Sequence, residues 1–281
     1  MQEAYQKDDA LLDDIARARA EGRSRVWWLG QSGFLIHTPD ATILFDPYLS
    51  DSLTRKYAAT DKPHTRVTER VIAPELLQGI DLITSSHNHT DHLDAETLLP
   101  LLETNPQARL VIPRANRAFA LERLGAVAER LLEIDAGETM LIGKVTLHGI
   151  AAAHNTVERD DQGRCRFLGF VARTGGLTFY HSGDTLMHDG LIPELAPFRP
   201  DIAFVPINGN KPERRVAGNL DGKEAAELAR AIHAGTAVPH HFDMFAFNTA
   251  SPEIFAAECK RLEQPFRVLR SGEGFDLSQS S

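Results

Sequence analysis

Apolar residues occur along the chain in short runs that are separated by Gly, Pro or Asp. Short apolar runs bounded by turn-forming residues are typical of β-strands. The pattern predicts a first series of strands at Arg25–Leu29, Gly33–His37, Thr42–Phe45, Asp81–Ser85 and Arg109–Ile112. It predicts a second series at Leu131–Ile134, Lys144–Ile150, Phe167–Arg173, Leu177–His181, Ile202–Pro206, Ala237–Pro239 and Phe266–Leu269.

A helical period appears in fewer places. Residues 8–21 predict an amphipathic helix, because apolar side chains recur there at helical spacing. Asp221 with Glu224 three residues later forms a capping-box pattern, which marks the start of another helix. The helices expected beyond the first are Ala95–Leu99, Lys223–His233 and Glu253–Leu262.

Many strands in both halves, with few helices between them, predict two packed sheets covered by helices. No linker is long or polar enough to mark a boundary, so we expect one domain over residues 1–281. Residues 1–22 form its N-terminal helical extension, and the polar tail at 276–281 is expected to fray. The long polar segment 51–79 is either a mobile lid or a loop that covers the sheets.

Charge and composition narrow the function classes. The chain has 42% hydrophobic and 25% charged residues, which is ordinary for a globular protein. Its formal net charge of −9 argues against binding of long nucleic acids, which depends on surplus Lys and Arg. A small anionic substrate held by a few local cations remains compatible with this charge.

The termini and cysteines point to an ordinary reduced protein. The acidic start MQEAYQKDDALLDD does not resemble a signal peptide, and no apolar run approaches the roughly 20 residues of a membrane span. Cys165 and Cys259 share no metal-like spacing and form no disulfide framework. We therefore expect a cytoplasmic protein without a membrane span.

The segment SSHNHTDHLD, residues 85–94, places three histidines and an aspartate in six positions directly after an expected strand. Imidazole and carboxylate are ligands that borderline divalent metals accept. A lone histidine would favour a solvated loop, but this cluster favours a metal site. Four donors from so short a segment crowd one tetrahedral ion, so two ions are expected. The candidate ligands are His87, His89, Asp91 and His92.

Further donors follow three later strands. His154 ends a strand-like run, Asp184 lies in a Gly-containing turn, and a pair of histidines, His240 and His241, follows an apolar segment. Taken singly, His154 could cap a loop, Asp184 could form an Asx-turn, and one histidine of the pair could pack in the core. Their occurrence together with the first cluster favours a shared site at one edge of the sheets.

Four motifs in order, SSHNHTDHLD, AAAHN, YHSGDT and VPHHFDMF, resemble the ligand motifs of the metallo-β-lactamase-fold hydrolases. LFDPYL, with Asp46, resembles an early aspartate motif of that family, and the resemblance extends from Arg25 to Leu269. It implies an α+β fold, the αββα sandwich, in which two mixed sheets pack face to face with helices outside. It also implies a binuclear metal site at one sheet edge.

The resemblance implies a role for each of these donors. One metal would be held by His87, His89 and His154. The second would be held by Asp91, His92 and His241, with Asp184 bridging the two ions. Asp46 would lie behind the ligands and orient them, as such residues do in metal sites generally. His241 is preferred to His240 as the last ligand, which leaves His240 in a supporting position.

Within the family, the closest likeness is to one branch. WWLGQSGFLI, HSGDT, PINGN and HHFDMF resemble the L-ascorbate-6-phosphate lactonases, which implies opening of a phosphorylated sugar lactone with an ion such as Mn²⁺. A histidine equivalent to His154 is not present throughout that branch, so the number of ions stays open. SHNHTDHLD also resembles the N-acylphosphatidylethanolamine-hydrolysing phospholipases D, which cleave phosphodiesters.

A site of this kind would act through a metal-bound hydroxide. Two divalent ions, Zn or Mn, would lower the pKa of a shared water, and Asp91 or Asp184 would aim it at the substrate. His181 lies in the same turn as Asp184 and is a candidate proton donor to the leaving alkoxide. Its alternative is a strand-end residue bonded to backbone.

Residues 206–215 are the expected substrate-binding segment, because they concentrate three cations in an acidic chain. Arg and Lys are suited to binding phosphate, although a solvated turn is the alternative. The candidates are Lys211, Arg214 and Arg215 for phosphate, with Asn208 and Asn219 for sugar hydroxyls. Nearby aromatic residues at 242–247 are either core or an apolar wall that would favour an acyl or aryl group.

The sequence as a whole predicts a metal-dependent hydrolase that opens a small lactone, with a phosphorylated sugar lactone as the candidate substrate. A phosphodiesterase of the same fold is the alternative, and a non-enzymatic metal sensor is a third hypothesis. The expected partner is a small-molecule substrate, and a homo-oligomer is compatible with the sequence.

Overall fold

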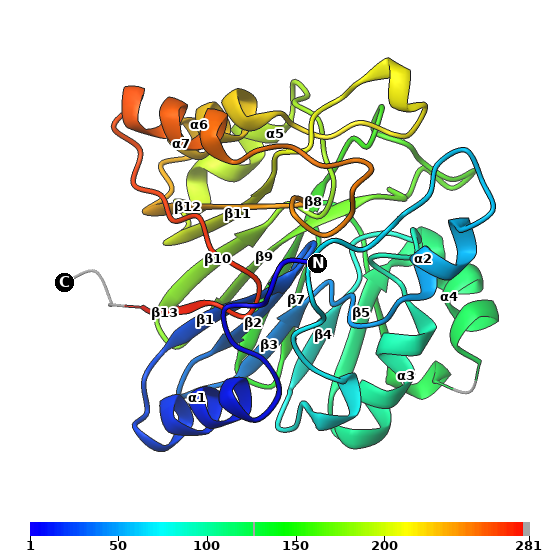
Figure 1. Cartoon of the computed structure of the whole chain (residues 1–281), viewed down its shortest axis with the longest axis vertical. Coiled ribbons are helices and arrows are strands. Elements are labelled where there is room, and N and C mark those ends of the chain that lie inside the picture. The colour runs from blue at the N-terminus through cyan, green and yellow to red at the C-terminus, as the bar shows by residue number, and fades with distance from the viewer. Residues whose placement is uncertain (126, 278–281) are drawn as a thin grey trace.

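The computed structural model describes residues 1–125 and 127–277, and its centre is a pair of mixed β-sheets packed face to face (Figure 1). The first sheet has the strand order β13-β1-β2-β3-β4-β5-β6. Its strands are β1 (Arg25–Gly30), β2 (Gly33–His37), β3 (Thr42–Phe45), β4 (Leu82–Thr84), β5 (Arg109–Pro113), β6 (Leu131–Ile134) and β13 (Gly274–Asp276).

The second sheet has the order β12-β11-β10-β9-β8-β7. Its strands are β7 (Thr139–Ile142), β8 (Val145–Ala151), β9 (Leu168–Thr174), β10 (Leu177–His181), β11 (Ile202–Pro206) and β12 (Thr236–His240).

Helices cover the outer faces of both sheets, so the layers follow the order αββα (Figure 1). Those beside the first sheet are α1 (Asp8–Ala20), α3 (Ala95–Thr104) and α4 (Arg117–Leu124). Those beside the second are α5 (Leu191–Leu195), α6 (Gly222–Ala231) and α7 (Glu253–Arg261). A short helix, α2 (Ser52–Tyr57), lies in the loop after β3. The predicted fold class is confirmed.

Alternation along the strands explains these layers. In β1, Val26 and Trp28 face the core between the sheets, whereas Trp27 and Leu29 pack with the helices outside. Successive side chains of a strand point to opposite faces, so both faces of the sheet are buried. Across the sheets, the Phe34 ring on β2 lies 4.1 Å from that of Phe204 on β11, measured between centroids.

The C-terminal end departs from the predictions. The strand expected at Phe266–Leu269 is wrong, because this segment forms one bridge, between Phe266 and Ala237. The last strand is β13, which pairs antiparallel with β1 and places Asp276 opposite Arg25. Asp276 is therefore held by a strand ladder and does not fray. Residues 278–281 of the expected tail lie outside the described residues.

Parallel pairing gathers several loops at one edge of the sandwich. β3, β4 and β5 are parallel in the first sheet, and β10, β11 and β12 are parallel in the second. The carboxyl ends of parallel strands meet at the same edge, and there the chain leaves β4, β10 and β12 toward the predicted metal ligands. Within residues 1–125 and 127–277, no helix is long and apolar enough to cross a membrane.

Candidate metal centre

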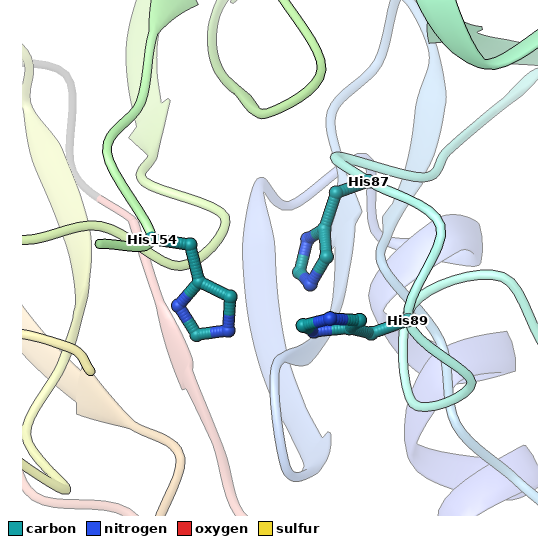
Figure 2. A group of neighbouring side chains, drawn as sticks. All are labelled: His87, His89 and His154. Atoms are coloured by element: carbon teal, nitrogen blue, oxygen red, sulfur yellow. The ribbon is translucent and has the colours of Figure 1, made fainter. Parts of the chain in front are cut away.

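Three histidines from two distant loops face one another at this edge (Figure 2). His87 and His89 lie on the loop after β4, and His154 follows β8. One ring nitrogen from each lies within 4.8 Å of the others. His154 Nδ1 donates to the Gly218 carbonyl oxygen at 2.9 Å, which leaves Nε2 without a proton. His87 Nε2 is buried and has no hydrogen-bond partner.

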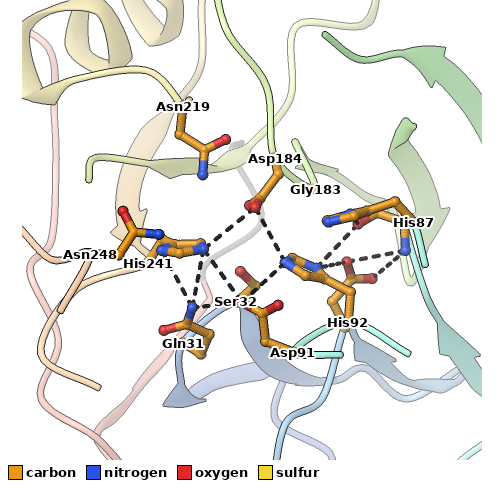
Figure 3. Close-up of polar contacts among 12 residues, drawn as sticks. Gln31, Ser32, His87, Asp91, His92, Gly183, Asp184, Asn219, His241 and Asn248 are labelled. Atoms are coloured by element: carbon orange, nitrogen blue, oxygen red, sulfur yellow. Dashed lines mark hydrogen bonds and ion pairs between the residues drawn. The ribbon is translucent and has the colours of Figure 1, made fainter. Parts of the chain in front are cut away.

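A second group adjoins the first and contains Asp91, His92 and His241 (Figure 3). Asp91 Oδ2 lies 3.8 Å from His92 Nε2 and 3.5 Å from His241 Nε2. On its far side, His92 Nδ1 bonds Asp46 Oδ2 at 2.7 Å. The Nε2 atom of His92 is buried and has no hydrogen-bond partner. Asp46 thus lies behind the ligands, where the sequence places it.

Asp184 lies between the two groups, on the loop after β10 (Figure 3). Its Oδ2 atom is 3.6 Å from His154 Nε2, 3.5 Å from His92 Nε2 and 3.4 Å from His241 Nε2. Its Oδ1 atom is buried without a partner. The preceding Gly183 has φ of +60°, and a Cβ there would lie 2.5 Å from the Leu168 carbonyl oxygen, so the turn requires glycine.

The three-histidine group favours neutral rings. His89 is exposed to solvent on one side, yet desolvation of its ring and the neighbouring His154 lower its pKa to about 4. Burial and the neighbouring imidazoles hold the pKa of His87 well below its usual value of 6.5. A neutral imidazole nitrogen is the form that binds a metal.

The ligands around the two aspartates favour charged side chains instead. Burial opposes charge on His241, but Asp184 and Asp91 outweigh it and raise its pKa to about 9. The pKa values of both carboxyl groups lie well below 3.8, since the facing histidines outweigh the effect of burial. A buried and a half-buried carboxylate that favour cations in this way also favour a metal dication.

These observations test whether the residues fit metal ions. The donors are imidazoles and carboxylates, which Zn and Mn accept, and three of their buried atoms have no partner within the described chain: His87 Nε2, His92 Nε2 and Asp184 Oδ1. An unpaired buried polar atom costs about 1–3 kcal/mol, and a bound cation would satisfy these three. The residues therefore fit divalent metal ions.

One residue of this site was not predicted from the sequence. Gln31, in the turn between β1 and β2, places Nε2 at 2.8 Å from Asp91 Oδ2 and 3.1 Å from His241 Nε2. Its carbonyl oxygen accepts from the His241 backbone N–H at 3.1 Å. The available signal was a buried polar residue in the otherwise apolar hairpin WWLGQSGFLI.

His181 and His240 lie behind the site and do not line it. His181 Nε2 donates to the Ser32 carbonyl oxygen at 2.8 Å, and its Nδ1 accepts from Gly183 N at 3.1 Å. With both nitrogens engaged by backbone and no exposed surface, His181 is not placed to donate a proton to a substrate. The His240 nitrogens contact the hydroxyls of Ser32 and Ser182. Of the two adjacent histidines, His241 joins the ligand group.

The metal-ligand groups open onto a cavity of about 480 Å³. Its wall includes α2 and the loop that follows it, so part of segment 51–79 covers the site. The same segment is also held to the body, since Val67 N donates to Met244 O at 2.9 Å. The lining comprises Leu53, Lys56, Tyr57, Lys62, His64, Asn88, His89, Thr90, Asp91, Phe119, Arg123, His154, Asp184, Val216, Ala217, His241 and Asn248.

The expected phosphate-binding residues do not line this cavity. Lys211 is exposed, and Arg215 pairs with Asp61. The Arg214 guanidinium is engaged by the carbonyl oxygens of Asn208 and Thr249 at 2.6 and 2.7 Å. The sequence pattern could not separate these cations from others, because it does not show which of them face the cavity.

Asn208 and Asn219 have no exposed surface and form a chain of amides instead. Asn219 Nδ2 donates to Asn208 Oδ1, and Asn208 Nδ2 donates to Asn248 Oδ1, each at 3.0 Å. Asn248 then lines the cavity beside His241 (Figure 3). The two predicted asparagines therefore support a third that the sequence did not single out.

Three residues of the apolar cluster after the last histidine belong to the interior, and the fourth, Phe247, is half-buried against His64. Phe242, Met244 and Phe245 are buried, and the Phe242 ring stacks on Trp28 with centroids 4.6 Å apart. None of the three lines the cavity described above. Of the two alternatives for these residues, the structure favours core, so they give no argument for an acyl or aryl substrate.

The fold and the ligand arrangement define a protein of the metallo-β-lactamase fold. The sequence pattern of the family described as Beta-lactamase superfamily domain matches residues 41–242, and the chain belongs to that family.

Known proteins resemble the chain along most of its length. A UPF0173 metal-dependent hydrolase of Myxococcus xanthus is 26% identical over 260 residues, which cover 90% of this chain and 82% of that protein. The metallo hydrolase Igni18 of Ignicoccus hospitalis has a TM-score of 0.65 at 19% identity, covering 91% of this chain and 98% of that one. An isothiocyanate hydrolase from Delia radicum gut bacteria has a TM-score of 0.70 at 16% identity, covering 90% of this chain and 100% of that one.

Proposed function

We propose that the protein is a metal-dependent hydrolase that holds two divalent ions, Zn or Mn, and opens a small lactone. The observation that carries the proposal is the convergence of seven donor residues, five of which line one cavity, with three buried donor atoms unpartnered. The names of the relatives support the general class. The sequence resemblance to the lactonase branch supports the lactone.

In this assignment, His87, His89 and His154 would hold one ion. Asp91, His92 and His241 would hold the other, and Asp184, which lies between the two groups, would contribute a further ligand. Such ions would supply Lewis acidity to the scissile carbonyl and would lower the pKa of a nearby water. Asp91 lines the cavity and, with Asp184, can accept a hydrogen bond from the attacking water and hold its proton.

Asn248 provides a hydrogen-bond donor of fixed orientation in the lining of the same cavity. Its Oδ1 atom accepts from Asn208 Nδ2 at 3.0 Å and from Arg214 Nη1 at 3.1 Å. Two donors on the oxygen fix the orientation of the amide, so that Nδ2 is left for an acceptor in the cavity. In the proposed reaction, this Nδ2 donates to a substrate oxygen that gains negative charge, a role that side-chain amides serve in acyl transfer.

The cavity sets the size of the substrate. A volume of about 480 Å³ lies within the range of roughly 300–1,000 Å³ for small-molecule sites. A small phosphodiester is the alternative substrate, because the same donors can support attack at phosphorus. A metal sensor is disfavoured, since a closed structural site uses about four ligands, whereas seven donors here open onto a cavity.

The test is hydrolysis by the protein reconstituted separately with Zn²⁺ and with Mn²⁺, on matched panels of lactones and phosphodiesters. Asp184→Ala should abolish turnover, and Asp189→Ala, at an exposed neighbouring aspartate, should not. Circular dichroism of each variant establishes that it is folded.

Lactone turnover that depends on Asp184 supports the proposal. Turnover of phosphodiesters alone would replace the lactone by the alternative substrate. Bound metal without turnover on either panel would favour the sensor.

A further inference from the structure

Basic residues near the cavity fall into two sets that differ in their partners. Arg55 and Arg215 each pair with a carboxylate, Glu96 and Asp61 respectively. Lys56, Lys62 and Arg123 line the cavity, and none of the three pairs with a carboxylate anywhere in the described part of the chain.

The chain has 39 acidic residues against 30 Lys and Arg, so a cavity whose lining holds three cations and two carboxylates is more basic than the chain as a whole. The acidic residues in the cavity lining are Asp91 and Asp184. Both already face His92 and His241 in the ligand groups. The three cations in the lining are therefore available to a bound anion.

Each cation is held in place by neutral contacts. Lys56 Nζ donates to Thr90 Oγ1 at 3.2 Å, in the loop that carries the histidine cluster, and Lys62 Nζ donates to the Arg215 carbonyl oxygen. Arg123 Nη1 donates to the carbonyl oxygens of Asn88 and Leu93 at 2.9 and 3.0 Å, and its guanidinium lies over the Phe119 ring. Contacts with neutral oxygens position a cation without forming an ion pair.

We infer that Lys56, Lys62 and Arg123 form an anion-binding subsite, and that the substrate carries a phosphate or carboxylate group in addition to the bond that is cleaved. The inference rests on the proposed function, since it assigns the substrate class of the same cavity. It replaces the segment 206–215 as the place where charge is recognised. Lys supplies a point charge to such an anion, and Arg supplies a planar pair of donors.

Calorimetric binding of three six-carbon probes tests the subsite without any turnover. Sorbitol is neutral, gluconate carries a carboxylate, and sorbitol 6-phosphate carries a phosphate; none contains a lactone or a phosphodiester. Each is titrated into metal-loaded and chelator-treated protein. We expect at least one anion to bind roughly tenfold or more tightly than sorbitol in both states, because charge-assisted bonds are strong.

Variants assign the preference to residues. Lys56→Gln with Lys62→Gln should remove most of the anion preference. The matched control Arg55→Gln with Lys211→Gln removes two positive charges from the same region, at residues that do not line the cavity, and should preserve it. Far-ultraviolet circular dichroism and metal content establish that both double variants are folded and loaded.

Equal binding of all three probes overturns the inference. So does a preference for anions that disappears with the metal, or one that survives the lysine substitutions. A preference for gluconate over sorbitol 6-phosphate identifies the anion as a carboxylate, and the reverse order identifies a phosphate. Anion binding that depends on the lysines, in a protein that hydrolyses neither panel, would sink the proposed function and leave this subsite standing.

Discussion

Asp46 Oδ2 lies 2.7 Å from His92 Nδ1, and neither residue has any surface exposed to solvent. The same carboxylate accepts from the Ser86 backbone N–H and the Thr84 hydroxyl. A carboxylate held by these donors fixes the proton of His92 on Nδ1 and directs Nε2 toward Asp91 and Asp184. The geometry of the ligand group therefore depends on a residue that does not belong to it.

Asp46→Asn should weaken metal binding by roughly 10- to 100-fold, because a neutral amide is a poorer acceptor for the His92 proton. Chelator competition measures the dissociation constant directly. Asp40→Asn is the matched control, since Asp40 lies at the surface and pairs with Lys144. Equal metal affinity in Asp46→Asn and the wild type would show that His92 needs no such support.

Removal of metal should lower the melting temperature of the wild-type protein. A ligand that binds only the folded state stabilises it by about 4 kcal/mol at a concentration a thousandfold above its dissociation constant. Scanning calorimetry with and without chelator measures the shift. In Asp184→Ala the shift should be much smaller, and in Asp189→Ala it should equal that of the wild type. A wild type that melts at one temperature in both conditions would contradict the metal assignment.

The ligands could be predicted because each follows a strand that the apolar pattern reveals. His154, Asp184 and His241 come after β8, β10 and β12, and their chemistry is uncommon enough to be noticed beside the cluster at 85–94. The capping box of Asp221 with Glu224 was likewise predicted and is present. Local sequence carries these features directly.

The supporting residues could not be predicted in the same way. Gln31 and Asn248 are amides in turns, and turns favour such residues for reasons unrelated to function. Their roles arise from contacts with residues far away in the chain, such as Gln31 with His241. For the same reason, the sequence could not show that Lys56 and Lys62 face the cavity whereas Lys211 does not.

Asn248→Ala should lower kcat for the lactone roughly a hundredfold, the effect typical for loss of one donor to a developing oxyanion. Arg214→Gln should have a smaller effect in the same direction, because Arg214 acts by orienting the Asn248 amide. Steady-state kinetics separate kcat from KM, and metal content should stay unchanged in both variants. Lys211→Gln serves as the control on the same loop. A lower metal content in Asn248→Ala would instead assign this residue to the metal site.

Phe34→Ala should destabilise the protein by about 3–5 kcal/mol, since it removes a fully buried ring between the two sheets. The expected cost includes the cavity beside Phe204 that the sheets cannot close. Urea unfolding in the presence of saturating metal measures it. Leu141→Ala, at a side chain that is 74% exposed, should change the free energy of unfolding by less than about 0.5 kcal/mol. Similar costs for the two variants would mean that the sheets repack around the missing ring.

Asp14→Asn should reveal a contribution to stability that depends on pH. Asp14 Oδ2 accepts from Trp27 Nε1 at 2.8 Å and from Gln6 Nε2 at 3.0 Å, and it pairs with Arg25 at 3.1 Å. Burial raises the pKa of Asp14, but the hydrogen bonds from Gln6 and Trp27 and the charge of Arg25 outweigh it and lower the pKa below its ordinary value of 3.8.

A carboxyl group whose pKa is lower in the folded state than in the unfolded state stabilises the fold. This contribution is fully present when the pH is above the pKa of the unfolded state, and it is lost as the pH falls through the pKa of the folded state. The free energy of unfolding of the wild type should therefore exceed that of Asp14→Asn by about 1–3 kcal/mol at pH 7. The difference should be the same at pH 6 and should shrink below about pH 4. Urea unfolding of both proteins across this range, with metal removed, measures the difference. Asp13→Asn, at an exposed neighbour, should show little effect at any pH. A difference that grows toward low pH would mean that Asp14 stabilises the fold in its protonated form.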